Sequence, residues 1–432
     1  MITKKLVEQI EGEALVSFDM DGSKVSYATV AFPHFRGMES ILEHKHPLDA
    51  LVYTPRVCGI CGHAHLMATV RALEDVYTNA GVEVVVSQKA KNIREFTLLM
   101  ESIQNHLKWI YMVVLPELQH LTKNGVKKMP LKGAFSASIA SKAIAVFAGQ
   151  WPHASYMLPG GITSDPTYIE VMQARNYLDE LIRFVEKETF GVEIEHFIAM
   201  QSCKDFRGLL SDAAQIERHL LALEMEQKGF GYDRFLILGE HSFSTSAKIK
   251  GTRIVGADAK YVTTTMGYAP DEQTFAYNAL YKDEYFETGP LARMMAGSHQ
   301  LVKNIHRRFK DSAYSRVIAR IYEVGIHLQH AKKLLDEIDV TQPSVNELPN
   351  ITKLSGVGVG IVEAPRGPLI HKISIENGHI ANYKITTPTQ FNIGSDTPNK
   401  LTPVQHAMKG LTQQEALFVF RTFDVCSVCT TH

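Results

Sequence analysis

The sequence has almost no net charge, because 45 Lys and Arg residues are balanced by 46 Asp and Glu residues. This balance argues against binding to nucleic acid or to an anionic membrane surface, since both select a clear excess of basic residues. No apolar run approaches the 18 or more residues of a membrane span, so we expect none in this chain. The polar N-terminus predicts no secretory signal peptide.

Cysteine is also scarce, but its distribution is far from even. Four of the five cysteines form two Cys-x-x-Cys pairs near opposite ends of the chain, and the fifth, Cys203, stands alone. Cys203 is predicted to be a small buried residue. Thiols that stay reduced or bind a metal suit the cytoplasm, so we expect a cytoplasmic protein, with any membrane association through partners.

The two pairs are Cys58 with Cys61 and Cys426 with Cys429. Brought together, four sulfurs would form a soft site for zinc, nickel, iron or an iron–sulfur cluster. One interpretation is a structural Zn(Cys)₄ clamp in a non-catalytic protein. Structural zinc usually supports a small module without its own core, however, and a chain of 432 residues with 45% hydrophobic content does not need that support.

Two β-hairpins are predicted from turn signals between alternating segments. Asp21-Gly22 separates residues 15–18 from residues 24–30, and Asn377-Gly378 separates residues 372–375 from residues 380–385. The predicted β structure therefore lies near both ends of the chain.

Three long segments between the hairpins have apolar residues at helical spacing. They span residues 90–114, 168–185 and 312–338, and we expect the first to end near Pro116. These elements predict an α+β fold that is mainly α, with a central bundle of long helices and small β-hairpins near both termini.

We expect residues 1–432 to form a single large compact domain. Within it, residues 1–60 would hold β structure and lead to the first cysteine motif, and residues 90–340 would form the helical bundle. Residues 360–432 would contain the second hairpin and the last cysteine motif.

Both cysteine pairs are embedded in longer motifs. Residues 56–65 resemble the Arg-x-Cys-Gly-x-Cys-x-x-x-His motif of nickel–iron hydrogenase large subunits, and residues 424–432 resemble their Asp-Pro-Cys-x-x-Cys-x-x-His terminus, with Val425 in place of proline. Residues 363–367, Glu-Ala-Pro-Arg-Gly, match a third motif of that family. The resemblance covers essentially the whole chain. It implies the hydrogenase large-subunit fold, which the quinone-site subunit of respiratory complex I shares without the metal cysteines.

The resemblance implies a bimetallic site. Cys58 and Cys426 would be terminal nickel ligands, and Cys61 and Cys429 would bridge nickel to iron. The iron would carry carbon monoxide and cyanide, as NiFe(CO)(CN)₂. Cyanide nitrogen atoms accept hydrogen bonds, and the resemblance assigns the surrounding positions to Pro365, Arg366 and Thr389.

The implied reaction is the reversible heterolytic splitting of H₂, which requires a Lewis acid beside a base. The resemblance assigns the base to Cys426 or Arg366. It assigns the next proton carrier to Glu11, although the flanking Gln9 and Glu13 depart from the family motif. His65 would donate to a bridging sulfur, and Asp424 would hydrogen-bond near Arg366.

A second metal site is implied beside the C-terminal histidine. The ligands of a magnesium ion would be Glu39, the backbone carbonyl near Ile393, and His432. Carboxylate and carbonyl oxygens suit this hard cation, whereas an imidazole nitrogen is a less usual ligand for it.

The paired cysteines leave none for an iron–sulfur cluster, so the electrons must pass to another polypeptide. We therefore expect an Fe–S small subunit as partner, with assembly of the heterodimers into a higher oligomer as a further option. The alternatives are the zinc clamp described above and a hydrogen-sensing hydrogenase with slow turnover.

Overall fold

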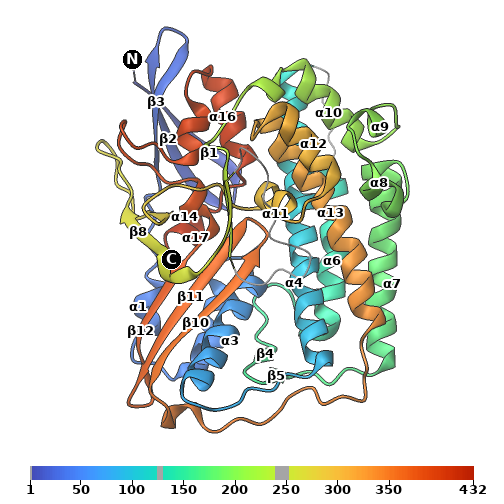
Figure 1. Ribbon diagram of the computed structural model, residues 1–432, viewed down its shortest axis with the longest axis vertical. Coiled ribbons are helices and arrows are strands. Elements are labelled where there is room, and N and C mark those ends of the chain that lie inside the picture. The colour runs from blue at the N-terminus through green and yellow to red at the C-terminus, as the bar shows by residue number, and fades with distance from the viewer. Residues whose placement is uncertain (1, 124–129, 239–252) are drawn as a thin grey trace.

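The computed structural model describes residues 2–123, 130–238 and 253–432. One half of the molecule is a bundle of long helices that stand side by side (Figure 1). Helix α4 packs against α6 and α13, and α6 packs against α7. The bounds of these four helices are α4 Gln88–Trp109, α6 Pro130–Ala148, α7 Tyr168–Phe184 and α13 Ala313–Asp336.

The sequence signals locate three of the four bundle helices. Helix α7 begins after a capping box at Thr167, and α13 begins after Ser312, whose side chain accepts a hydrogen bond from the backbone of Ser315. The predicted helix of residues 90–114 corresponds to α4 and the turn after it.

The predicted end of that helix at Pro116 is wrong. A π-helical turn, Ile110–Val114, follows α4, and α5, Leu115–Leu121, continues in the same direction with Pro116 in its first turn. Proline lacks an N–H and its ring clashes with the carbonyl four residues earlier in a regular helix. A π-turn shifts the backbone hydrogen bonding by one residue, so the helical conformation continues through Pro116.

Helix α6 was not predicted, and it also corrects the expectation about apolar runs. By length and composition Leu131–Ala148 could span a membrane, with a mean hydropathy of 1.3, and half of this segment is buried inside the protein. Its contacts with α4 and α7 are those of a core helix, which has the same composition.

Two three-stranded antiparallel sheets contain the predicted hairpins and extend each of them by one strand. The N-terminal sheet has the order β1-β2-β3, and the late sheet has the order β10-β11-β12. The strands are β1 Ile2–Ile10, β2 Gly12–Asp21, β3 Lys24–Ala31, β10 Gly356–Ala364, β11 Gly367–Glu376 and β12 His379–Thr386.

The remaining elements are shorter or connect the two halves. The helices are α1 Met38–Leu42, α2 Ala50–Tyr53, α3 Gly62–Asn79, α8 Ile194–Ala199, α9 Lys204–Arg207, α10 Asp212–Ala222, α11 Pro290–Ala296, α12 Gln300–Phe309, α14 Pro388–Asn392, α15 Pro403–Met408, α16 Gln413–Thr422 and α17 Ser427–Thr430. The strands are β4 Met157–Leu158, β5 Gly161–Ile162, β6 Arg234–Leu238, β7 Arg253–Ala257, β8 Val262–Met266 and β9 Tyr277–Tyr281. Among the named strands of the described residues, β6 and β7 pair in parallel and the other pairs are antiparallel.

Glycines on β10 bring helix α3 directly onto the late sheet. A Cβ atom at Gly358 would overlap the carbonyl oxygen of Ala72, and one at Gly360 would overlap that of Ala68. Only glycine allows this close approach of strand and helix. The contact fixes α3, which follows the first cysteine pair, relative to β10.

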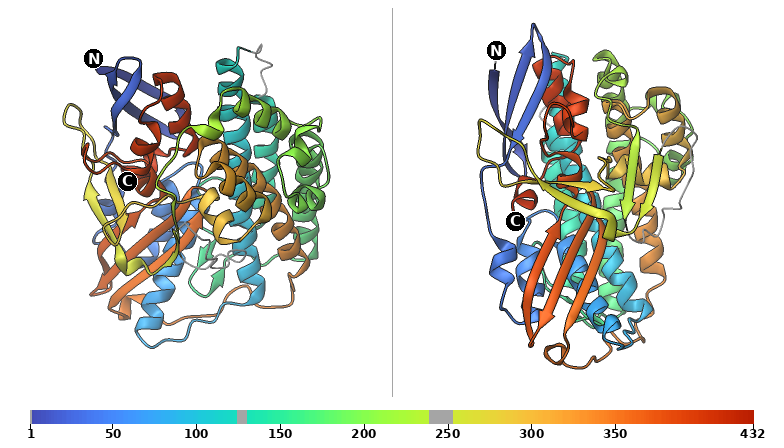
Figure 2. Two further views of the ribbon diagram at one scale, coloured as in Figure 1. Left: turned by 45° about the horizontal axis from the view of Figure 1, so that its top comes forward. Right: turned by 60° about the vertical axis from the view of Figure 1, so that its left-hand side comes forward.

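The C-terminal segment lies between the two three-stranded sheets, as both views in Figure 2 show. The backbone N–H of Ser427 donates to the carbonyl oxygen of Glu11 at 2.8 Å, which ties this segment to the N-terminal sheet. One hydrophobic cluster contains residues from Val7 to Val425, so both ends of the chain belong to the same core.

Candidate metal centre

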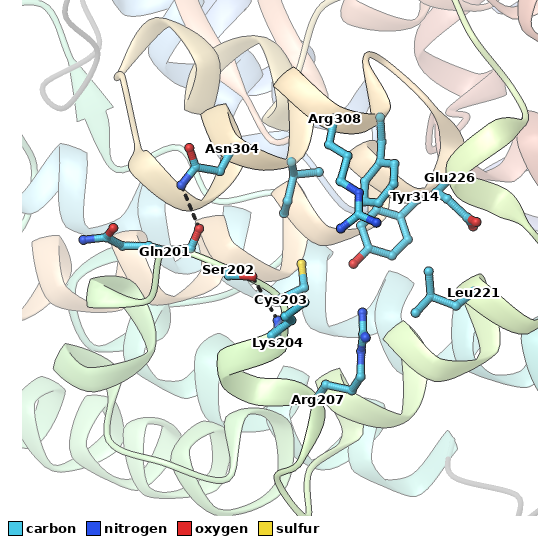
Figure 3. A pocket seen from close by; sticks show the side chains of 12 residues that line it. Gln201, Ser202, Cys203, Lys204, Arg207, Leu221, Glu226, Asn304, Arg308 and Tyr314 are labelled. Carbon is cyan, nitrogen blue, oxygen red and sulfur yellow. Dashed lines mark hydrogen bonds between the residues drawn. The ribbon is translucent and has the colours of Figure 1, made fainter.

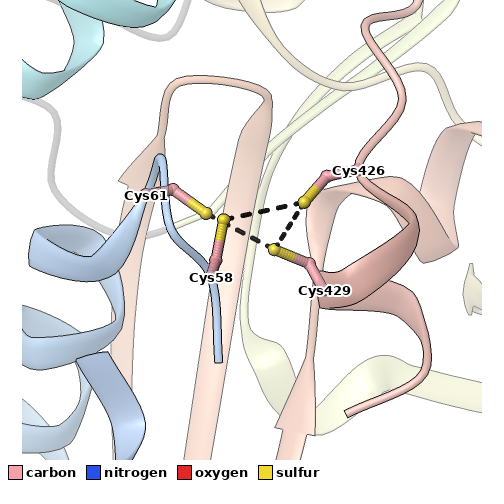
Figure 4. A group of neighbouring side chains, drawn as sticks. All are labelled: Cys58, Cys61, Cys426 and Cys429. Atoms are coloured by element: carbon pink, nitrogen blue, oxygen red, sulfur yellow. Dashed lines mark hydrogen bonds between the residues drawn. The ribbon is translucent and has the colours of Figure 1, made fainter. Parts of the chain in front are cut away.

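The four motif cysteines lie together, although they come from opposite ends of the chain (Figure 4). All four sulfur atoms lie within 4.8 Å of one another. Cys58 faces Cys426 with 3.7 Å between the sulfurs, and Cys61 faces Cys429 with 3.4 Å between them. The two sulfurs of the C-terminal pair are 2.8 Å apart. Each sulfur of one pair thus has a counterpart in the other pair.

Local structure explains how each pair presents its thiols. Cys58 and Cys61 lie in the turn before α3, and Cys426 and Cys429 lie at the start and within the single turn of α17. The buried carboxylate of Glu101 accepts hydrogen bonds from the backbone N–H groups of His63 and Ala64, at 2.9 and 3.0 Å. These bonds satisfy the free donors of the α3 N-terminus and hold the first turn in place.

All four cysteines are buried and none forms a disulfide. Four thiols in one buried group form a soft donor set that suits nickel, iron or zinc. Burial raises the pKa of Cys426, but hydrogen bonds with the other three sulfurs, together with the charge of Arg366, lower it more, so its pKa lies well below the usual value. A deprotonated sulfur is the form that binds a metal.

A cavity with about 260 Å³ of atom-free space adjoins the sulfurs. Its walls combine three of the cysteines with residues from three other segments: His65, Ala364, Pro365, Arg366, Leu369, Pro388 and Thr389. The Thr389 side chain is buried, and within the described part of the chain its hydroxyl has no hydrogen-bond partner. The cavity wall therefore holds both an unused hydroxyl donor and a guanidinium group.

Arg366 is buried in the wall of this cavity, and each of its three guanidinium nitrogens donates a hydrogen bond. Its Nε donates to the backbone oxygen of Asp424 at 2.9 Å, Nη2 donates to the Asp424 carboxylate at 3.2 Å, and Nη1 donates to the amide oxygen of Asn105 at 3.1 Å. The Asp424 carboxylate also pairs with Arg320. Asp424 and Arg366 are therefore in contact.

Glu11 lies beside both cysteine pairs. It forms an isolated parallel β-bridge with Cys426, and its carboxylate approaches Gly59, between the first two cysteines. Burial and the neighbouring Cys58 raise the pKa of Glu11, although Arg366 and Lys108 oppose the shift. The structure thus places a carboxyl group of raised pKa next to the sulfurs.

His65 lies behind the fourth cysteine. Its Nε2 is 3.8 Å from the Cys429 sulfur, and its Nδ1 is 3.0 Å from Nε2 of His371. Burial lowers the pKa of His65 to about 4, so the ring is neutral near pH 7.

Of the three predicted magnesium ligands, Glu39 and His432 are in contact, and Ile393 is not hydrogen-bonded to either within the described residues. Glu39 lies 3.3 Å from Nε2 of His432, and the carboxylate also accepts hydrogen bonds from Lys384 and the backbone of Ile385, each at 2.8 Å. Burial raises the pKa of Glu39, but the bond to His432 and the other partners lower it more. Ile393 is buried at the end of α14, and no hydrogen bond within the described residues joins it to Glu39 or His432.

This geometry agrees with the comparisons to known proteins. A family model described as nickel-dependent hydrogenase matches residues 36–118 and 256–432, which together make up more than half of the chain. The chain belongs to the nickel-dependent hydrogenase family. The matched ranges include both cysteine pairs.

Relatives of this nickel-dependent hydrogenase cover nearly its full length. It is 25% identical to the coenzyme F420 hydrogenase subunit alpha of Methanothermobacter thermautotrophicus over 99% of this chain and 91% of the relative. It is also 25% identical to the periplasmic NiFeSe hydrogenase large subunit of Desulfomicrobium baculatum, over 93% and 88% of the two chains. The solved NiFeSe hydrogenase of D. vulgaris Hildenborough, in the reduced state, has a TM-score of 0.83 at 20% identity over the whole of both chains, which confirms the predicted fold class.

A larger cavity of the hydrogenase is separate from the four motif cysteines (Figure 3). It has about 960 Å³ of atom-free space between α12 and the segment that contains α9, and Cys203, Arg207, Arg308 and Tyr314 are among its lining residues. None of its lining residues belongs to the cavity beside the sulfurs. Cys203 is buried in its wall, as its isolated position predicts.

A second group with metal-ligand side chains is His106, Glu323 and His327 in the helical bundle. Both oxygens of the Glu323 carboxylate accept hydrogen bonds from Arg293, at 2.7 Å each. Because this buried arginine already neutralises the carboxylate, the group is a packed ion pair rather than a cation site.

Sequence reasoning missed three residues that shape the metal centre, namely Asn105, Arg320 and His371. Asn105 and Arg320 lie within predicted helices, and His371 lies at the start of the predicted late hairpin region. Their polar side chains are buried, which the structure alone reveals, so no signal in the sequence identified them.

Proposed function

We propose that the four-cysteine group of this chain holds nickel and iron and catalyses the reversible heterolytic oxidation of H₂, with this chain as the catalytic large subunit. The observation that carries the proposal is the convergence of both cysteine pairs, with sulfurs within 4.8 Å, beside a buried arginine. The family match and the relatives named as hydrogenase subunits support it.

The pairing of sulfurs supports distinct roles for the cysteines. Cys58 and Cys426 face each other and would hold nickel as terminal ligands, whereas Cys61 and Cys429, which also face each other, would be shared by nickel and iron. Three of the four, Cys61, Cys426 and Cys429, line the adjoining cavity, which is where the iron and its small ligands would lie.

The same cavity fits carbon monoxide and cyanide as iron ligands. Cyanide nitrogen accepts hydrogen bonds, and the wall supplies the unused hydroxyl of Thr389 and the guanidinium group of Arg366. The apolar ring of Pro365 and the side chain of Leu369 fit the less polar carbon monoxide. These donors would hold the ligands without any added residue.

When bound, the nickel–iron group supplies the Lewis acidity and redox chemistry for splitting H₂. The chain supplies the base and the proton exit. Cys426 is the first proton acceptor in this proposal, and Glu11 takes the proton next, because its backbone forms a β-bridge with Cys426 and its carboxyl group, which lies near Gly59, has a raised pKa. Asp424 keeps Arg366 oriented toward the cavity.

We also propose a magnesium ion near Glu39 and His432, with the carbonyl of Ile393 as a further ligand. The contact between Glu39 and His432 supports this placement. Ion binding would require Glu39 to exchange its bond with Lys384 for the cation.

The subunit names of the relatives imply a small-subunit partner, and we propose that this partner carries the iron–sulfur clusters. Assembly of the heterodimers into a higher oligomer stays a prediction. One relative is named as periplasmic, so the cytoplasmic location also stays a prediction.

The test is an infrared spectrum of the purified protein, together with its metal content. Bands in the carbon monoxide and cyanide stretching region, with nickel and iron each near one per chain, would support the proposal. Zinc near one per chain without such bands would instead identify a structural clamp and would refute it.

A further inference from the structure

A continuous series of buried polar contacts leads from the sulfurs into the late sheet. His65 Nε2 lies 3.8 Å from the Cys429 sulfur, and His65 Nδ1 lies 3.0 Å from His371 Nε2. His371 Nδ1 lies in turn 2.7 Å from the Tyr383 hydroxyl oxygen. The rings of these three residues have at most 1% of their surface exposed. The members come from α17, α3, β11 and β12, so only the folded protein connects them.

Threonine hydroxyls fix the direction of the bonds at the far end of the series. The Thr54 hydroxyl donates to the carbonyl oxygen of Ala50 at 2.8 Å, which uses its only hydrogen. The Thr69 hydroxyl donates to the Thr54 oxygen at 2.8 Å or to the carbonyl oxygen of His65 at 2.9 Å. Neither acceptor has a hydrogen to return, so the Thr69 hydrogen is used there and the Thr69 oxygen can only accept, not donate, on its other side.

Two arrangements of hydrogens remain, because Tyr383 and His371 both lie near the Thr69 oxygen, at 2.9 and 3.1 Å. In the first, Tyr383 donates to His371 Nδ1, His371 Nε2–H donates to His65 Nδ1, and His65 Nε2–H points at Cys429. In the second, the two imidazole tautomers are reversed, and a bare lone pair of His65 Nε2 faces the sulfur.

The charge on the sulfur decides between the two arrangements. His65 Nδ1 and His371 Nε2 lie 3.0 Å apart, so a single hydrogen lies between them, and neither buried ring has a carboxylate partner in the series that would hold a second hydrogen on it. A metal-bound cysteine is a thiolate. A thiolate attracts an N–H group and repels a lone pair, so metal binding selects the first arrangement.

We propose that His371 and Tyr383 are positioning residues that hold His65 in the tautomer that donates a hydrogen bond to the Cys429 sulfur. The tautomer follows from these contacts together with a thiolate at Cys429, which any bound metal provides, whereas its effect on nickel and iron rests on the proposed nickel–iron function. A donor to a bridging sulfur withdraws electron density from the metals. Tyr383 and His371 thus change the electron density at the metals without contacting them, through the hydrogen bond from His65 to Cys429.

The first test needs neither iron nor catalysis. Protein labelled with ¹⁵N-histidine is loaded with Zn(II) alone, which makes the sulfurs thiolates and is diamagnetic. The ring nitrogen shifts of His65 and His371, assigned from spectra of the His65→Gln and His371→Gln variants, should show hydrogen on Nε2 of both rings. Hydrogen on Nδ1 of His65 would overturn the proposal.

The second test uses the infrared bands of the holoprotein. His371→Leu removes the donor to His65, so the carbon monoxide and cyanide bands should move to lower wavenumber at unchanged nickel and iron content. His371→Gln retains an N–H donor and should keep the bands near their original positions. Tyr383→Phe removes the hydroxyl that donates to His371 Nδ1, so it should shift the bands in the same direction at unchanged nickel and iron content.

Tyr77→Phe is the matched control, since this buried tyrosine lies on α3 and donates to the carbonyl of Pro349, outside the series. Its bands should match those of the unaltered protein. Equal bands in His371→Leu and the unaltered holoprotein would overturn the tuning role. Absence of the bands from the unaltered protein would refute the nickel–iron proposal, and the tautomer measured with zinc would still decide the positioning role.

Discussion

Replacement of Asp424 by asparagine should expose how much the metal centre depends on one buried carboxylate. Asp424 is buried, contacts both Arg366 and Arg320, and adopts a left-handed backbone conformation with φ of 57°. Asparagine has nearly the same volume and tolerates this conformation, so the variant removes charge with little backbone strain.

The expected cost follows from the two arginines that would lose their counter-ion. Removal of one partner from a buried ion pair costs about 3–5 kcal/mol, because the remaining charge stays buried. The metal-free protein should therefore lose about this much free energy of unfolding. Metal loading should reduce the loss, since the thiolate sulfurs lie near Arg366 and provide negative charge.

Chemical denaturation of the metal-free and metal-loaded forms would measure both values. Asp396→Asn is the matched control, because Asp396 accepts a bond from the neutral Tyr285 hydroxyl, and its loss should cost only about 1 kcal/mol. A loss below about 1 kcal/mol in metal-free Asp424→Asn would refute the importance of the ion pairs.

The pH dependence of this difference has a definite sign. Burial raises the pKa of Asp424, but Arg366 and Arg320 lower it more, so the folded-state pKa lies below the unfolded value. The contribution of the carboxylate is therefore present above an unfolded pKa of about 3.9 and is lost as the pH falls through the folded pKa. The two proteins should differ by a constant amount between pH 5 and 8 and converge only in stronger acid.

Four further predictions concern the site itself. Serine at Cys61 or Cys426 should abolish metal assembly or turnover, as shown by nickel and iron analysis, whereas Cys203→Ser should change neither. Glu11→Gln should retain both metals but suppress H₂ exchange with D₂O at least tenfold; exchange at the normal rate would disprove the proton path. Arg366→Lys should retain the metals and lose most activity, because an ammonium group cannot replace the planar fork that contacts both Asp424 and Asn105. Chelator-treated protein should lose its infrared bands while its far-ultraviolet circular dichroism persists, since the large hydrophobic core does not depend on the metals.

Local signals in the sequence were sufficient for much of the secondary structure. The Asp21-Gly22 and Asn377-Gly378 turns lie within the observed sheets, and the capping residues Thr167 and Ser312 mark the starts of α7 and α13. The prediction that the helix ends near Pro116 failed, because a π-turn before this proline lets the helical conformation continue, and sequence spacing does not reveal such a turn.

The sequence by itself determined the donor set of this protein, because Cys-x-x-Cys spacing, the Glu-Ala-Pro-Arg-Gly segment and the terminal histidine are local patterns. Only the tertiary structure decided which sulfurs face each other, that Asn105 and Asp424 share the guanidinium group of Arg366, and that His371 stands behind His65. Each of these contacts joins segments that are far apart in the chain, and a buried polar contact forms only where folding removes water from both partners at once.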